Sequence, residues 1–214
     1  MKRFALLLLC AAFAWPQVAT KANAGYKTKE GRDSVAKTLD APNRDKTQKP
    51  EDIVAALNIQ PGMTVADIGT GTGYMLPFLS RAVGASGHAI GEDIAADFLD
   101  RARAKLSEDK LSNVQLILGT ETDPKLPPSA VDIELVLDVY HHFDYPAKML
   151  AHLAEGLKPS GHLVIIDFYK RDRPDHIRLE REDVIQEIEA NGFHLLEKRD
   201  TIGNKQYLLE FAKR

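Results

Sequence analysis

Short apolar runs and amphipathic segments alternate along the chain from about residue 50 to its end. The runs are rich in β-branched residues and are bounded by turn residues, which is typical of strands. The predicted strands span residues 64–68, 87–91, 114–118, 133–137, 163–168, 193–198 and 206–211. Helical spacing of apolar residues predicts helices at 50–57, 74–83, 95–106, 146–157 and 181–191. Residues 158–161, Lys-Pro-Ser-Gly, are predicted to form the turn before the fifth strand.

This alternation predicts the fold class and the domain organisation. Strands that alternate with helices form a mostly parallel, doubly wound α/β sheet with helices on both faces. The last two predicted strands are separated by a short loop containing Gly203-Asn204, which favours an antiparallel hairpin at the C-terminus. We therefore expect one domain over residues 51–214. The polar residues 25–50 precede it as an irregular arm, with a short helix around 34–39.

The first 24 residues resemble an export signal. A basic start, Lys2-Arg3, precedes an apolar run at 4–15, which is too short to span a bilayer that needs ~20 residues. Ala22-Asn23-Ala24 has small residues where signal peptidase requires them, so we expect cleavage after Ala24 and a periplasmic or secreted protein. Ala12-Phe13-Ala14 is a second such motif, disfavoured by Pro16 just beyond it. An uncleaved anchor or a buried N-terminal helix is the alternative.

Cleavage after Ala24 changes what the composition allows. It removes Cys10, the only cysteine, so the mature chain would have no disulfide, thiol nucleophile or cysteine-ligated zinc. It also removes three basic residues and no acidic ones, which takes the formal net charge from −3 to −6. Because no basic tract remains, we expect no nucleic-acid partner. We also expect a monomer with no stable membrane span after cleavage.

The turn after the first predicted strand carries the main chemical signal. It reads Asp67-Ile-Gly69-Thr70-Gly71-Thr-Gly73, and ligands of such sheets bind beyond the carboxyl ends of the strands. Dinucleotide sites favour the spacing G-x-G-x-x-G, with pyrophosphate at the helix N-terminus. Here the spacing is G-x-G-x-G, and an aspartate would repel a pyrophosphate but suit an ammonium group. The turn therefore favours S-adenosyl-L-methionine (SAM) over NAD.

From about residue 53 onward the sequence resembles the small, single-domain class I SAM-dependent methyltransferases, whose fold is Rossmann-like. Val65–Gly73 matches the first motif of that family, and Asp93 matches the acid that bonds the ribose, with Glu92 as the alternative. Thr120 stands where the family usually has an acid beside the adenine, and Glu121 is the substitute. The resemblance implies a cofactor site made of Asp67, Gly69, Thr70, Gly71, Gly73, Asp93, Ile94, Thr120, Glu121 and Asp138.

The resemblance places the acceptor site after the fourth and fifth strands. His141 or His142 is a candidate general base, although one of them can instead cap a helix while the other packs on the sheet. Tyr140 is a further candidate catalytic residue that can line the pocket or pack in the core. Asp138 and Asp167 can approach each other at this edge, but no third ligand is evident, so no metal site is assigned.

Two segments outside these motifs can reach the same edge. Arg44 in the arm is placed to meet the carboxylate of SAM if the arm folds over the cofactor, and a solvated loop is the alternative. The charged loop at 170–174 can meet an acidic acceptor or remain solvated.

Two functions are compatible with this sequence. The first is a methyltransferase that transfers a methyl group from SAM to an O, N or C atom of an unidentified small-molecule acceptor. The second is an exported SAM-fold protein that binds a ligand without catalysis, which the export signal keeps open because SAM is made in the cytosol.

Overall fold

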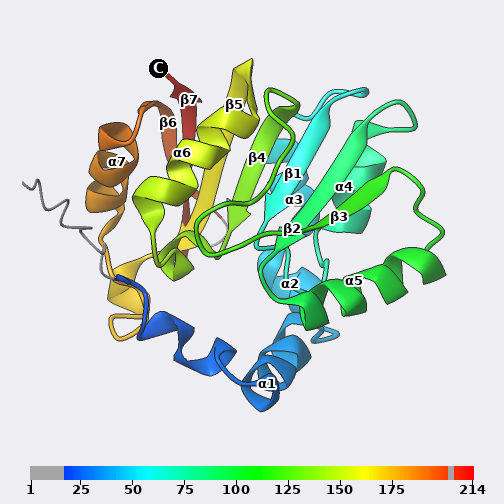
Figure 1. Cartoon of the computed structure of the whole chain (residues 1–214), viewed down its shortest axis with the longest axis horizontal. Helices are drawn as coiled ribbons and strands as arrows, with labels where there is room; N and C mark the ends of the chain where they lie inside the picture. Colours follow the sequence, from blue (N-terminus) through cyan, green and yellow to red (C-terminus); the bar gives the residue numbers. More distant parts are fainter. Residues whose placement is uncertain (1–16, 202–204) are drawn as a thin grey trace, which may run out of the picture.

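The computed structural model describes residues 17–201 and 205–214 (Figure 1). Within these residues, one seven-stranded sheet has the order β3-β2-β1-β4-β5-β7-β6. The strands from β1 to β5 pair in parallel, and β7 is antiparallel to both neighbours, which confirms the predicted sheet with its antiparallel C-terminal strands. Gly203 and Asn204, predicted in the loop between the last strands, lie outside the described residues. The strands are β1 (Thr64–Ile68), β2 (His88–Asp93), β3 (Val114–Leu118), β4 (Val131–Leu137), β5 (Leu157–Phe168), β6 (Phe193–Thr201) and β7 (Gln206–Lys213).

Helices cover both faces of the sheet. Among the described residues they are η1 (Ala22–Tyr26), α1 (Lys29–Leu39), α2 (Arg44–Gln48), α3 (Pro50–Ala56), α4 (Leu76–Val83), α5 (Ala96–Glu108), η2 (Tyr140–His142), α6 (Pro146–Gly156), η3 (Lys170–Asp172) and α7 (Arg181–Ala190). Leu150 and Leu153 of α6 and Ile188 of α7 pack on one face. Ile53 of α3 and Leu79 of α4 pack on the other. Burying apolar side chains on both faces is what the near-continuous apolar strands require.

The N-terminal arm is more helical than predicted. The short helix expected around 34–39 is the second half of α1, and most of the remaining arm is helical as well. Thr28 caps α1 by accepting a hydrogen bond from the Gly31 amide at 3.1 Å. Asp33 of α1 then pairs with Arg101 of α5 at 2.8 Å. The arm has too few apolar residues for a helical stripe to be visible in the sequence, and only Ala36 of α1 is buried. Tertiary contacts with α5 therefore determine structure that local pattern did not predict.

The predicted turn at 158–161 is also different, because these residues belong to the long strand β5. Leu157 pairs with Val131 at the start of β4, and the register shifts before Ile133 pairs with His162. An irregularity of this kind keeps pairing despite extra residues in one strand. The smaller corrections concern ends: α4 begins at Leu76 instead of residue 74, because residues 71–75 form turns around the glycines.

The arm lies along the carboxyl edge of the sheet. In Figure 1 the blue and light-blue helices η1, α1 and α2 run below the ends of the central strands, between η3 and α5. The strand order reverses between β1 and β4, so this edge is the topological switch point where ligands of such sheets bind. A search of the described residues for a helix both long and apolar enough to cross a membrane finds none.

Candidate functional site

A pocket of about 1320 Å³ lies between this edge and the arm. Its walls come from the glycine turn, the ends of β2 and β4, η2, the loop after η3, and the arm. Pockets for one small ligand usually have ~300–1,000 Å³. The volume therefore suffices for a cofactor and an acceptor side by side, which a transfer reaction requires.

The glycine turn bends sharply into the pocket. Gly69 and Gly71 have φ angles of +69° and +58°, in the left-handed region that side chains rarely adopt. A Cβ on Gly69 would lie 2.6 Å from the Val139 side chain, and a Cβ on Gly71 would lie 2.9 Å from Leu39 of the arm. Both glycines are therefore required by conformation and by space. Thr70 between them also lines the pocket, whereas Gly73 packs against Ala102 of α5 and does not line it.

Asp67 places a buried carboxyl group at the base of the pocket. It is 3% exposed, and its Oδ2 accepts a hydrogen bond of 2.6 Å from the Thr70 hydroxyl. Burial raises the pKa of Asp67 to about 7, against the opposing effects of the Thr70 bond and the Arg44 charge. Such a group favours a cation beside it, since the cation would offset the desolvation of the carboxylate.

Arg44 of α2 faces the same space from the arm. Its guanidinium lies 3.9 Å from the centre of the Tyr74 ring, and its Nη1 donates to the Leu39 carbonyl at 2.9 Å. Burial lowers its pKa, partly offset by the charges of Asp138 and Asp67. An acid and a guanidinium thus line one end of the pocket, which is the charge pattern of a zwitterionic amino-acid group.

Two acids end β2 and line the pocket beside the turn. The Asp93 carboxylate accepts hydrogen bonds from the Gly71 and Ala95 amides, both at 2.8 Å, and burial raises its pKa to about 6. Glu92 accepts a bond of 3.3 Å from the Gly69 amide through Oε2. Its Oε1 is buried and has no hydrogen-bond partner among the described residues. Either acid can therefore bond a ligand hydroxyl, and Glu92 has the unused acceptor.

The remaining predicted cofactor residues divide into two groups. Ile94, Glu121 and Asp138 line the pocket. Thr120 does not, because its hydroxyl accepts a bond from the Asp123 amide at 3.0 Å and closes a tight turn. The expectation that Thr120 lies beside the adenine is thus not met by its position.

Tyr140 is likewise not in the pocket. It is 1% exposed, packs in the core with α6 and α7, and its hydroxyl donates to Glu187 at 2.6 Å. Tyr140 therefore packs in the core and does not reach the catalytic position expected for it. The reason is that η2 directs successive side chains to different sides.

His141 is held as one half of an acid–imidazole pair. Its Nδ1 lies 2.8 and 2.9 Å from the two Asp167 carboxylate oxygens, and both residues are buried. Asp167 also accepts from the His141 amide at 3.2 Å and from the Phe168 amide at 2.8 Å. It is therefore fully engaged, and Asp138 is bonded by Gln206. The Asp138–Asp167 cation site that the sequence left open is not supported by these contacts.

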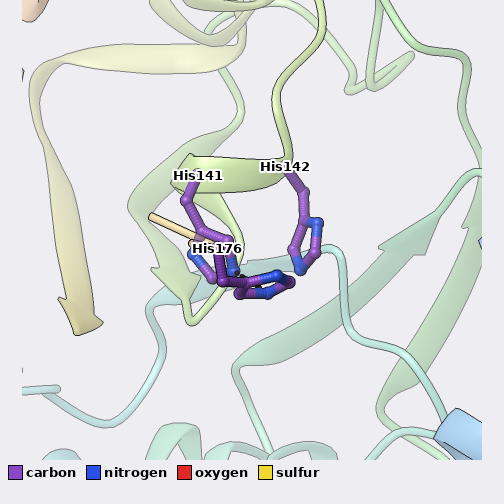
Figure 2. Close-up of side chains that lie close together, drawn as sticks. All are labelled: His141, His142 and His176. Atoms are coloured by element: carbon purple, nitrogen blue, oxygen red, sulfur yellow. Dashed lines mark hydrogen bonds between the residues drawn. The ribbon is translucent and has the colours of Figure 1, made fainter. Parts of the chain in front are cut away.

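His142 and His176 lie next to His141 (Figure 2). His142 Nδ1 is 2.7 Å from Oδ1 of Asn23. Burial, with the charges of the neighbouring histidines, lowers the pKa of His142 to about 2, so that its ring is neutral. His176 comes from the loop after η3, and its Nε2 is 3.2 Å from Nε2 of His141. Neither Asn23 nor His176 was predicted as a site residue. Asn23 was assigned to the export signal, in the cleavage motif Ala22-Asn23-Ala24, and His176 is a lone polar residue with no motif around it.

The segment before residue 25 is built into the site. The Ala19 amide donates to Oδ1 of Asp144 at 3.0 Å, and the Val18 amide donates to the Asp144 carbonyl at 3.2 Å. The Asn23 side-chain amide donates to the His142 carbonyl and to Oδ2 of Asp144, both at 3.0 Å. Residues 18–23 therefore position one wall of the pocket.

A mostly parallel sheet with this acid–glycine turn after its first strand and an acid at the end of its second is the arrangement expected of a SAM-dependent methyltransferase. The chain belongs to the methyltransferase-domain family, whose model matches residues 59–213. A SAM-dependent methyltransferase from Aquifex aeolicus has the same fold with a TM-score of 0.80 and 29% identity, over 85% of this chain and 98% of that one. The cofactor is S-adenosyl-L-methionine.

Named relatives cover the chain less completely. The ubiquinone/menaquinone biosynthesis C-methyltransferase UbiE of Vibrio parahaemolyticus is 28% identical over 140 residues, which is 65% of this chain and 51% of that protein. A demethylmenaquinone methyltransferase of Listeria monocytogenes is 30% identical over 112 residues, 52% of this chain and 47% of that protein. The chain thus spans about half the length of these curated relatives.

Proposed function

We propose that this SAM-dependent methyltransferase acts on a small molecule with an ionisable hydroxyl group, a phenol or an enol, methylated at oxygen or at an adjacent carbon. The observation that carries this is the buried His141–Asp167 pair, which faces the same pocket as the glycine turn. A neutral imidazole oriented by a carboxylate can take a proton from an acceptor as the acceptor attacks the methyl carbon. Two relatives are named as methyltransferases of quinone biosynthesis or of demethylmenaquinone, which is compatible with such an acceptor because the reduced form of a quinone is a phenol.

The pocket supports a specific orientation of SAM. The Asp67 carboxylate would bind the ammonium group, and Arg44 would bind the carboxylate of the amino-acid end. Glu92 or Asp93 would accept bonds from the ribose hydroxyls, with Ile94 and Glu121 beside the adenine. His141 lines the same pocket and would act as the base. His142 is a weaker candidate, because burial disfavours the doubly protonated ring that a base must become.

We also propose that the chain is exported and acts as a monomer. The Lys2-Arg3 start and the apolar run after it support export, although residues 1–16 lie outside the described structure. The contacts of Ala19 and Asn23 with Asp144 favour a processing site upstream of residue 17, at the Ala12-Phe13-Ala14 motif instead of Ala24. Mass spectrometry of the protein purified from its own cells will give the N-terminal residue, and size-exclusion chromatography its mass.

Ligand binding without catalysis is the second candidate, since an exported protein needs an outside supply of SAM. Titration calorimetry of the full-length chain with SAM, S-adenosylhomocysteine and NADH separates the cases, with Asp67→Ala as the test variant. We expect SAM to bind with micromolar affinity, NADH not to bind, and Asp67→Ala to weaken SAM at least tenfold. Product formation with a panel of phenols and enols then tests catalysis. If SAM binds and no acceptor from any class is methylated, the binding function replaces catalysis.

A further inference from the structure

Three imidazole rings meet at the acceptor end of the pocket. One ring nitrogen from each of His141, His142 and His176 lies within 4.8 Å of the others, and all three residues line the pocket. Figure 2 shows the rings of the two η2 histidines on either side of the His176 ring. Zinc–imidazole bonds of ~2.0–2.1 Å place tetrahedral ligand nitrogens about 3.3 Å apart. The distance of 3.2 Å between Nε2 of His141 and Nε2 of His176 is of this size.

Hydrogen bonds behind two of the rings determine which nitrogen is free. His141 Nδ1 faces both oxygens of Asp167, which accept only, so Nδ1 carries the proton and Nε2 carries a lone pair. The Asn23 side-chain nitrogen donates to two acceptors, the His142 carbonyl and Asp144. Its Oδ1 must therefore be the atom that faces His142 Nδ1, and His142 likewise has its lone pair on Nε2.

This arrangement is the one that metal-binding histidines require. Ligating imidazoles almost always donate their other N–H to a carboxylate or a carbonyl oxygen, which fixes the tautomer and the ring orientation. The alternative is a direct hydrogen bond in which Nε2 of His176 donates its proton to Nε2 of His141. That bond gives no partner to Nε2 of His142. The carboxyl groups of Asp167 and Asp144 lie behind the rings, and Arg173 is a nearby cation that also lines the pocket.

We propose that His141, His142 and His176 bind a divalent transition-metal ion, of which zinc fits best, at the acceptor end of the SAM pocket. Imidazole ligands suit zinc, iron, copper and nickel, and three protein ligands leave a coordination position open. That position would take the hydroxyl oxygen of a phenol or an enol. The ion would lower the pKa of the bound hydroxyl, whose proton passes to water. The oxygen or the adjacent carbon then bonds to the methyl carbon as the methyl–sulfur bond breaks and S-adenosylhomocysteine leaves. Attack by carbon also releases the proton on that carbon to water.

The proposal rests on the proposed methyltransferase function and changes one part of it. With the ion bound, His141 holds the metal and is no longer free to act as the base. The acceptor must then bind the ion through an oxygen atom, as the hydroxyl group of a phenol or an enol can. No fourth protein ligand completes the cluster among the described residues, which is the pattern of a catalytic rather than a structural site.

Cobalt(II) binding to the metal-free, full-length chain tests the site, because tetrahedral cobalt absorbs visible light strongly. We expect one equivalent to bind, with displacement by zinc. His176→Ala, a partly exposed loop position, should reduce the cobalt affinity at least a hundredfold. His88→Ala is the matched control, because this exposed histidine lies at the amino end of β2. It should leave the affinity unchanged.

S-adenosylhomocysteine binding is measured on the same samples to separate the two proposals. Retained binding in His176→Ala shows that the variant is folded and that its cofactor site is intact. The metal site is refuted if the parent chain takes up no stoichiometric cobalt, or if His176→Ala and His88→Ala bind it equally. Absence of S-adenosylhomocysteine binding in the parent chain refutes the methyltransferase proposal instead, whatever the cobalt result.

Discussion

The two ends of the pocket are built from different kinds of sequence. At the cofactor end, β1, the glycine turn and the end of β2 lie within 30 residues of chain. The turn bonds to the strand ends on both sides, Thr70 to Asp67 and Gly71 to Asp93. At the acceptor end, Asn23, His142 and His176 come from segments up to 153 residues apart. A site made by one local motif can be read in a sequence, whereas a site assembled from distant single residues is visible only in the fold.

The largest effect that would distinguish the two ends is expected from Gly71→Val. A valine there must adopt a φ of +58°, and its Cβ would lie 2.9 Å from Leu39. We expect SAM affinity to fall more than a hundredfold with some loss of stability, because left-handed backbone costs about 1–2 kcal/mol and is worse for a β-branched residue. Calorimetry measures the affinity. Gly25→Ala is the control, since nothing lies within 4 Å of its added Cβ.

Asn23→Ala should weaken metal binding and leave SAM binding intact, whereas Gly71→Val weakens SAM binding. It removes the oxygen that holds His142 Nδ1 and leaves the glycine turn untouched. We expect cobalt affinity to fall by roughly 10–100-fold, as for other partners of metal-bound histidines, while SAM affinity stays within twofold. If SAM affinity falls as far as cobalt affinity, the two ends are not independent and the comparison is wrong.

The pH dependence of SAM binding gives the smallest of the three effects. Burial raises the pKa of Asp67 to about 7 in the free protein, and an ammonium group beside it favours the ionised form. As pH falls below 7 the carboxyl is increasingly protonated before binding, so we expect the dissociation constant to rise about fivefold from pH 7 to pH 6. The ammonium group of SAM stays charged in acid, so the loss of affinity must come from a group of the protein. Asp67→Asn should bind weakly with no such slope; an equal slope would assign it to another acid.

The same contrast explains how much the sequence revealed. The mostly parallel sheet, its antiparallel C-terminal strands and the helices on both faces follow from apolar periodicity. The positions of Asp67 and Gly69 follow from one turn motif, and that of Asp93 from the family resemblance. Tyr140 and His141 are adjacent in the sequence, but one enters the core and the other the pocket. Residue type alone cannot distinguish them, because η2 sets the direction of each side chain.

Most of the helical structure of the arm, beyond the short helix expected around 34–39, was not predicted for a related reason. Its helices are held by polar contacts to distant residues, such as Arg32 with Asp97 at 2.8 Å and the Tyr74 hydroxyl with Asp45 at 2.7 Å. Contacts of this kind have no sequence period. Thr120 shows the reverse case, in which a residue at a motif position closes its own turn and does not line the pocket.

The bond between the Ala19 amide and Asp144 has a consequence for the order of folding. It closes a loop of 125 residues, so a chain that emerges N-terminus first cannot form it until more than half of the protein has been made. The glycine turn and β2 are complete some 50 residues earlier. Contacts of large sequence separation form slowly, because the entropy of loop closure must be overcome first. A nascent chain can therefore contain its whole cofactor motif while Val18 and Ala19 still have no surface to dock against.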